Sequence, residues 1–236
     1  MNIFRKACAA LAAACALGIP AMTPQAHAIS GGEEASSPYI VQLRINHPGQ
    51  EKQNKCTGSL LNDSWVVTAA HCAENTNQDG IEVYVSNNKA NPGEKVLTDR
   101  IELSPSADLA LLHLSTPKQV SEYAHLTAGH QFKEGEEGYI YGFGRGFEGK
   151  DVTWLRRAHV RVIGEGTDSY WQDTYRLKGL DGTSNHGDSG GPFLIGDELV
   201  GINVTGSHTA DYYIHENSGS LQLTPHLQWI HQTMGM

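Results

Sequence analysis

The sequence predicts an all-β protein made of antiparallel barrels, with one helix at its C-terminus. Apolar and polar residues alternate with the period of a half-buried strand in three segments, namely 40–45, 81–85 and 159–163. Short apolar runs, typical of strands buried on both faces, occur at 65–67 and 109–112. Turns rich in Gly, Pro, Asn and Asp separate these segments, and there is no internal repeat.

The best helix candidate is the final dozen residues. Thr224 can serve as the N-cap, and Pro225 suits the first helical position because no N–H is needed there. We therefore expect one terminal helix after the last strand.

Length and composition indicate a globular chain. Its 236 residues are 39% hydrophobic and 18% charged, which suffices for one large domain or two small ones. The formal net charge of −9 repels phosphate backbones and anionic lipid. Nucleic acid and membrane surfaces are therefore not expected as partners. We expect a monomer.

Residues 1–28 have the pattern of a secretory signal peptide. Two basic residues precede an apolar stretch at 7–19, and a small-x-small cleavage site ends at Ala28. The apolar stretch is too short to span a bilayer, and no later segment approaches the ~20 residues required. We expect a secreted protein that begins at Ile29. The alternative, a lipid-modified terminus at Cys15, would cut the apolar stretch very short.

Two of the four cysteines would leave with the signal peptide. The remaining pair, Cys56 and Cys72, is most simply a disulfide in an oxidising compartment, where two free thiols are disfavoured. The bond would close a loop of about 17 residues, for which chain-entropy arguments give roughly 3 kcal/mol. It would tie the neighbour of His71 to the strand that contains Cys56.

The hexapeptide Gly187–Pro192 carries the strongest chemical signal in the chain. Ser189 can act as a nucleophile if a base removes its proton and donors stabilise the oxyanion that forms. Its three glycines let the backbone turn sharply and present N–H groups toward a reacting oxygen. Because Gly-x-Ser-Gly also occurs in ordinary turns, the assignment depends on partner residues.

Two residues are candidates for these partners. His71 is the candidate base, and Asp108 is the candidate carboxylate that fixes the imidazole tautomer and stabilises the cation. Asp108 places a charge at an otherwise apolar strand, where it must be satisfied. Taken alone, it could equally cap a turn at the end of that strand.

Together these segments resemble the trypsin and chymotrypsin family of serine proteases. The likeness covers essentially the whole mature chain in the family's order, through Ile29–Gly32, Cys56–Leu61, Trp65–Cys72, Asp108–Leu112, Tyr141–Gly144, Gly187–Pro192 and Trp229–Ile230. The order His, Asp, Ser separates this family from subtilisins and α/β-hydrolases. The single disulfide and the short signal favour a bacterial member.

The resemblance implies two packed six-stranded antiparallel β-barrels, at 29–125 and 126–236, that form one peptidase unit with a cleft at their junction. His71 would be the general base and then the acid, Asp108 would orient it, and Ser189 would attack the peptide carbonyl to form an acyl-enzyme. Protein or peptide substrates are the expected partners, and this chemistry requires no cofactor.

The loop around the serine has two further implied roles. The backbone N–H groups of Gly187 and Ser189 would form the oxyanion hole. In the family, an N-terminal Ile or Val amine pairs with the Asp before the nucleophile, which here is Asp188. Ile29 directly follows Ala28, so signal peptidase itself would expose the activating amine. The alternative is a short propeptide that another protease removes.

The resemblance also locates a substrate pocket. Trypsin-like relatives have an Asp six residues before the nucleophile, where this chain has Thr183, so we expect a non-tryptic specificity. Val204, Thr205 and Gly206 align with the strand that pairs with substrate backbone. Gly206, with Gly219 as a weaker match, would leave an open uncharged slot for a medium or large apolar or polar side chain.

Two departures from the family affect this pocket. Asn185 replaces a cysteine, so the disulfide beside the pocket is absent. A long loop contains His208, Asp211 and His215, any of which could redirect specificity. Acid-specific relatives place a histidine where this chain has Asn203, so an acidic preference ranks lower.

No metal is expected. The twelve histidines form no cluster with metal-ligand spacing. We interpret His186 as a solvated loop residue. The alternative is that it contacts the substrate. The run Gly142, Gly144, Gly146 lacks a following helix, so we interpret it as a turn.

The competing function is a catalytically silent homologue that binds proteins through the same cleft, although such a protein has no chemical need for a complete triad.

Overall fold

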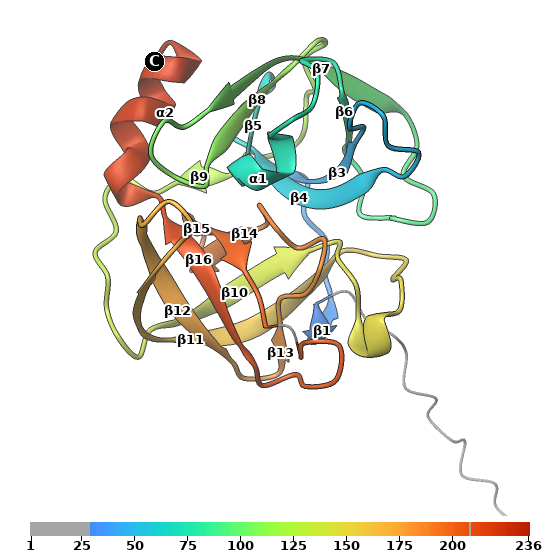
Figure 1. Cartoon of the computed structure of the whole chain (residues 1–236). Coiled ribbons are helices and arrows are strands. Elements are labelled where there is room, and N and C mark those ends of the chain that lie inside the picture. Colours follow the sequence, from blue (N-terminus) through green and yellow to red (C-terminus); the bar gives the residue numbers. More distant parts are fainter. Residues whose placement is uncertain (1–28, 208) are drawn as a thin grey trace, which may run out of the picture.

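Figure 1 shows the computed structural model of the chain, in which residues 29–207 and 209–236 are described. The expected signal peptide, with Cys15 and the cleavage site, lies outside the described residues, as does His208. The described chain consists mostly of β-strands that close into two six-stranded antiparallel barrels, stacked one above the other in the view of Figure 1. The predicted fold class is confirmed.

The first barrel closes in the strand order β3-β4-β5-β8-β7-β6. Its strands are β3 Ile40–Ile45, β4 Asn54–Leu60, β5 Trp65–Thr68, β6 Ile81–Tyr84, β7 Lys95–Leu103 and β8 Ala110–Leu114. Val41, Leu43 and Ile45 all enter its core, as the two-residue period of a strand requires. The apolar runs predicted at 65–67 and near 109–112 form β5 and β8, which pair with each other.

The second barrel closes in the order β10-β14-β15-β16-β12-β11, because β11 also pairs with β10. Its strands are β10 Glu137–Gly142, β11 Arg156–Thr167, β12 Asp173–Gly179, β14 Pro192–Ile195, β15 Glu198–Thr205 and β16 Asn217–Gln222. Ile140, Val160, Tyr175 and Phe193 fill its core.

Short strands attach the ends and connections to the second barrel. β1 Ser30–Gly31 pairs with β13 Gly182–Thr183, and β2 Glu33–Glu34 pairs with β11. β9 His125–Leu126 pairs in parallel with β15, so the expected boundary between residues 125 and 126 falls inside a strand. The first residues of the described chain therefore lie on the second barrel, before the chain enters the first.

Two short helical turns and two helices complete the fold. α1 Ala70–Ala73 follows β5, the 3-10 turn η1 Phe147–Gly149 lies between β10 and β11, and the 3-10 turn η2 Thr224–His226 leads into α2 Leu227–Met234. The terminal helix is confirmed, but the prediction that Thr224 is its N-cap was wrong. Thr224 begins the 3-10 turn instead, and its hydroxyl donates to the carbonyl of His130.

The terminal helix returns to the first barrel, beside which it stands in Figure 1. Its residue Ile230 is completely buried in the same apolar cluster as the first-barrel core. That cluster also includes Leu199 and Leu221 of the second barrel, so apolar packing continues across the junction. The helix therefore fastens the two barrels together from outside the cleft.

The disulfide predicted between Cys56 and Cys72 is present and joins β4 to α1. The two Cα atoms are 6.3 Å apart, and the residues are 16 positions apart in the sequence. Since His71 is the neighbour of Cys72, the bond anchors the turn that carries the imidazole to an adjacent strand.

Candidate active site

His71 and Asp108 meet at one end of the first barrel. His71 lies on α1 directly after β5, and Asp108 lies two residues before β8, the strand that pairs with β5. The Asp108 carboxylate accepts the backbone N–H of His71 at 2.9 Å and contacts the ring Nδ1 at 2.7 Å. Because Nδ1 is engaged, Nε2 is the ring nitrogen left to face the cleft.

The surroundings of His71 change its basicity. Burial alone would lower the pKa of the imidazole, but the hydrogen bond and charge of Asp108, with the charge of Glu74, raise this pKa above its ordinary value. Asp108 is itself 2% exposed, so its charge is little screened by water. The pair is therefore arranged to stabilise an imidazolium.

Polar groups of the second barrel hold the Asp108 segment in place. The buried Asp168 carboxylate, between β11 and β12, accepts the backbone N–H of Asp108 at 2.9 Å. It also accepts the N–H groups of Tyr170 and Gln172, both at 2.8 Å. The Tyr170 hydroxyl hydrogen-bonds the carboxylate of Glu74, which follows α1. One loop of the second barrel thus contacts both segments that carry the His71–Asp108 pair.

Thr57, on β4 of the first barrel, holds the loop that carries Ser189. Its backbone N–H donates to the Ser189 carbonyl at 2.9 Å, and its hydroxyl donates to the Gly187 carbonyl at 3.0 Å. The same hydroxyl accepts the N–H of Phe143 at 3.1 Å. Gly190 has a φ of +78°, and a Cβ there would overlap the Thr57 carbonyl. Glycine at 190 therefore lets the serine loop touch the first barrel.

The His71 imidazole and Ser189 line one cleft of about 770 Å³, whose walls come from both barrels. The ligand atoms of Cys56, His71 and Cys72 lie within 4.8 Å of one another, but the two sulfurs are bonded to each other. Neither sulfur is then a thiolate, so this group does not provide a metal site while the disulfide is intact.

The backbone N–H groups of Gly187 and Ser189 take part in no hydrogen bond within the described chain. The surrounding loop residues all donate theirs, namely His186, Asp188, Gly190 and Gly191. Two donors one residue apart, next to a serine, are thus available to an acceptor from outside the protein.

Asp188 is completely buried beneath this loop. Its carboxylate accepts the N–H of Gly144 at 2.7 Å and that of Asn185 at 2.8 Å, and it is also hydrogen-bonded by the backbone nitrogen of Ile29. Burial raises the pKa of Asp188 to about 7, although the three hydrogen bonds act in the opposite direction. The structure therefore brings Ile29 and Asp188 together.

Gly142 and Gly144 make room for this buried acid. A Cβ at either position would overlap the Asp188 carboxylate. The sequence analysis interpreted these glycines as part of a turn. Two of them also have a packing role, because they leave the space that the Asp188 carboxylate occupies.

Asn185 forms a hydrogen-bond network where related proteases have a cysteine. Its Nδ2 donates to the Ser30 hydroxyl at 3.0 Å and to the Asp211 carboxylate at 2.8 Å. Its Oδ1 accepts the N–H of His186 at 2.7 Å. One side chain therefore connects β1, the loop after β15 and the loop that leads to Ser189.

A smaller pocket of about 350 Å³ opens beside Ser189, and Val204, Thr205 and Gly206 line it as expected. The other lining residues are Ser184, Asn185, His186, Asn203 and Ser207. Thr183 and Gly219 do not line it. The Thr183 side chain is fully buried and donates to the Glu216 carbonyl, because β13 pairs with β1 and turns it away from the pocket.

Asn203, which the sequence analysis placed where acid-specific relatives have a pocket histidine, is among the lining residues. It is 2% exposed, and its Oδ1 accepts the Ser220 hydroxyl at 2.9 Å. Its Nδ2 has no hydrogen-bond partner in the described chain. The long loop is less involved, since His215 contacts the Gly179 carbonyl and lies outside the pocket lining.

Comparison with known proteins identifies the family. The family model described as Trypsin matches residues 29–217. The chain belongs to the trypsin family. A trypsin of Simulium vittatum is 31% identical over 228 residues, which cover 82% of this chain and 90% of that protein. An uncharacterized peptidase of Corynebacterium glutamicum (strain R) is 27% identical, with 95% of this chain and 80% of that protein covered.

Solved structures of other proteins superpose on this fold. HL collagenase superposes with a TM-score of 0.74 at 25% identity, covering 88% of this chain and 99% of that chain. The scabies mite inactivated protease paralogue S-I1 superposes with a TM-score of 0.72 at 23% identity, covering 87% and 99%. The second likeness shows the shared fold alone.

Sequence reasoning missed the residues that position this trypsin-family site. Thr57 and Asp168 contact the candidate catalytic segments from the opposite barrel. Thr57 lies in the segment Cys56–Leu61 that resembles the family, but that resemblance assigned it no role, and Asp168 lies in no motif. The available signal for Asp168 was an acid two residues before the pair Tyr170–Trp171, because a carboxylate near bulky aromatic side chains needs polar partners if it is buried.

We expect Thr57→Val to disturb the serine loop. The valine keeps the shape but leaves the Gly187 carbonyl and the Phe143 N–H without their partner, which should cost about 1–3 kcal/mol in the free energy of unfolding. Denaturant unfolding and the rate of reaction with a fluorophosphonate should both decline. Thr57→Ser, which keeps the hydroxyl, is the matched control. Equal behaviour of the two variants would contradict the role given to the hydroxyl.

Proposed function

We propose that the protein is a secreted serine endopeptidase in which Ser189 is the nucleophile, His71 is the general base and acid, and Asp108 orients His71. One observation carries this proposal. The hydrogen-bonded His71–Asp108 pair and the Ser189 loop line the same cleft, beside two backbone N–H groups that have no acceptor in the described chain.

The reaction would follow from these positions. Nε2 of His71 takes the proton of the Ser189 hydroxyl as its oxygen attacks the peptide carbonyl, and Asp108 stabilises the resulting imidazolium. The N–H groups of Gly187 and Ser189 bind the negative oxygen, a contribution of ~3–4 kcal/mol for one such donor. His71 then gives its proton to the leaving amine, and water hydrolyses the acyl-enzyme by the same steps.

Ser189 should therefore react covalently with a fluorophosphonate probe. Ser189→Ala should abolish labelling and lower peptide hydrolysis by at least ~10³-fold, because the triad acts as a unit. Intact-protein mass spectrometry and peptide assays measure both. Ser207→Ala, a serine that lines the neighbouring pocket, should still be labelled.

The same experiment tests the competing function. Family membership does not by itself establish activity, since one similar structure is described as an inactivated protease paralogue. A folded, correctly processed protein that neither reacts with the probe nor cleaves peptides would favour a silent homologue that binds proteins through this cleft.

Activation would require a free amine at Ile29. An ammonium there would pair with the Asp188 carboxylate, which otherwise meets uncharged N–H donors. Losing one side of a buried ion pair typically costs ~3–5 kcal/mol. Because Asp188 lies between Gly187 and Ser189, the pair would order both oxyanion donors. Cleavage after Ala28 by signal peptidase would create this amine without a separate activating step.

We expect a chain with one extra residue before Ile29 to be less active and to respond differently to pH. A buried carboxyl with a pKa of about 7 stabilises the native state in its protonated form, so that contribution is lost as pH rises toward 7. In the mature chain the amine stays charged up to about pH 7.7 and compensates the carboxylate.

The difference in melting temperature between the two forms should therefore widen from about pH 5 to about pH 7. Calorimetry on both proteins measures it, and N-terminal sequencing of secreted protein identifies the natural start. A constant difference, or equal activity of the two forms, would contradict the ion pair.

The pocket beside Ser189 should take a neutral side chain. No Lys, Arg, Asp or Glu is among its lining residues, so a basic side chain would find no counter-charge there. The pocket's polar lining groups, the hydroxyls of Ser184 and Ser207 among them, carry no formal charge that would favour an ionic side chain.

Peptide pools that differ in the residue before the scissile bond test this specificity. Leucine and glutamine should both be cleaved faster than lysine or arginine, because no lining residue offers a counter-charge. Fluorophosphonate labelling of the same preparation checks that its active site has formed. A preference for lysine or arginine would overturn the assignment.

Secretion remains part of the proposal. None of the helices in residues 29–207 and 209–236 is long and apolar enough to cross a membrane. The buried disulfide between Cys56 and Cys72 also suits an oxidising compartment.

A further inference from the structure

The cleft beside Ser189 has the opposite charge to the rest of the chain. The sequence contains 26 acidic and 17 basic residues, for a formal net charge of −9. The cleft is nevertheless lined by four cations and one carboxylate, namely Lys52, Lys55, Lys89, Arg145 and Asp151. A positive cleft on an acidic protein calls for an explanation in terms of what enters it.

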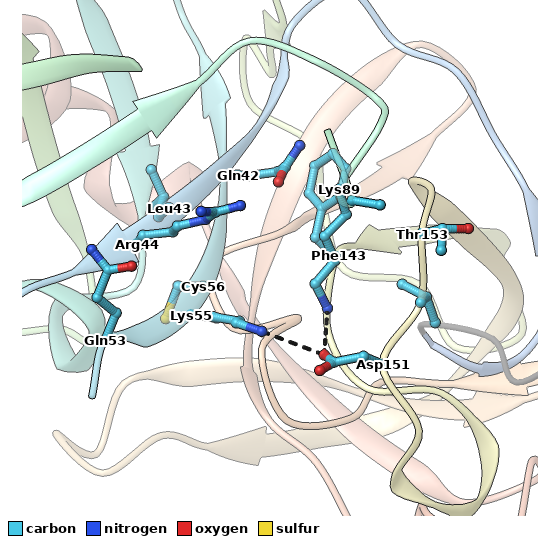
Figure 2. Close-up of a pocket in the computed structure, with 12 residues that line it drawn as sticks. Gln42, Leu43, Arg44, Gln53, Lys55, Cys56, Lys89, Phe143, Asp151 and Thr153 are labelled. Atoms are coloured by element: carbon cyan, nitrogen blue, oxygen red, sulfur yellow. Dashed lines mark hydrogen bonds and ion pairs between the residues drawn. The ribbon is translucent and has the colours of Figure 1, made fainter. Parts of the chain in front are cut away.

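The cations come from separate segments and meet around Asp151. Figure 2 shows the Lys55 and Lys89 side chains converging on that carboxylate, with Nζ···O distances of 3.4 and 3.2 Å. Lys89 also donates to the Gly144 carbonyl at 3.0 Å, which fixes it between the barrels. The adjoining hollow of about 360 Å³ adds Arg44, whose guanidinium lies 4.6 Å from the centre of the Tyr84 ring.

Asp151 does not neutralise this group. It is a single carboxylate shared by two lysines, and its side chain is 70% exposed. Lys52 and Arg145 are exposed and form no ion pair within the described residues. Two cations therefore remain available at the cleft wall.

Two hollows contain Ser189, namely the pocket of about 350 Å³ and the cleft of about 770 Å³. Their other lining residues give the position of the cations relative to the scissile bond. The smaller one contains Val204–Gly206, the strand that pairs with the acyl part of a substrate. The larger one contains none of these residues and is bounded by the Cys56–Cys72 disulfide and Gly187. A peptide held in the first must leave Ser189 through the second, so the cations face its leaving-group side.

We propose that this cleft selects peptides with acidic residues within three positions after the scissile bond. The inference rests on the proposed peptidase function and adds a substrate class to it. A substrate carboxylate there would meet Arg145 or Lys52, the two cations without an ion pair within the described residues, and these two lie on separate segments of the cleft wall. The negative field of the protein as a whole opposes acidic peptides, so the preference must come from the cleft itself.

Internally quenched peptide pools test the proposal. Each pool has a mixed residue before the scissile bond and Glu, Gln or Lys fixed at one of the three positions after it. At low ionic strength, kcat/KM should be about three- to tenfold higher with Glu than with Lys at the best position, as expected for partly exposed charge pairs. The ratio should approach one near 1 M salt, where the screening length is about 3 Å.

Charge reversal at the cleft provides the matched comparison. Arg145→Glu should lower or invert the Glu-to-Lys ratio. Lys133→Glu changes the net charge equally at an exposed position outside all three hollows, and should leave the ratio unchanged. Equal cleavage of all pools, or an equal effect of both variants, would overturn the inference. Cleavage of no pool, together with no fluorophosphonate labelling, would instead overturn the peptidase function.

Discussion

The buried carboxylate of Asp188 is the constraint on which the rest of the site depends. An isolated carboxylate cannot remain charged in an apolar interior unless donors surround it, and here three backbone nitrogens do so. These nitrogens belong to Ile29, Gly144 and Asn185, which lie in three separate segments. Satisfying one charge therefore brings the residue before β1, the loop after β10 and the serine loop to one point.

The chemistry is divided between two barrels, so its geometry depends on how they dock. Thr57 links the first barrel to the serine loop, and Asp168 links the second barrel to the Asp108 segment. The first contact therefore runs from the first barrel to the second, and the other runs from the second barrel to the first. Apolar packing between the barrels, completed by Ile230 of α2, provides the free energy, while these few polar contacts set the relative position.

Two features of this chain bear on its architecture and on its substrates. Asn185 connects three segments through hydrogen bonds where relatives use a cysteine, so the loop beside the pocket is held without a second disulfide. The cleft is basic on an acidic protein. The first feature maintains the family's architecture by other means, whereas the second bears on which substrates the architecture admits.

The sequence by itself was sufficient for the class of fold, the strands at 40–45, 65–67 and 159–163, the disulfide and the candidate catalytic residues. The strands follow from the two-residue period of the local sequence, the disulfide from the two cysteines left after the signal peptide, and the two barrels and candidate catalytic residues from short motifs that resemble a known family. Tertiary structure alone decided the roles of Thr57 and Asp168, the removal of Thr183 from the pocket, the 3-10 turn at Thr224, and the convergence of cations around Asp151. These features join residues far apart in the sequence, and strand register and barrel docking, which no local pattern encodes, determine which of them meet.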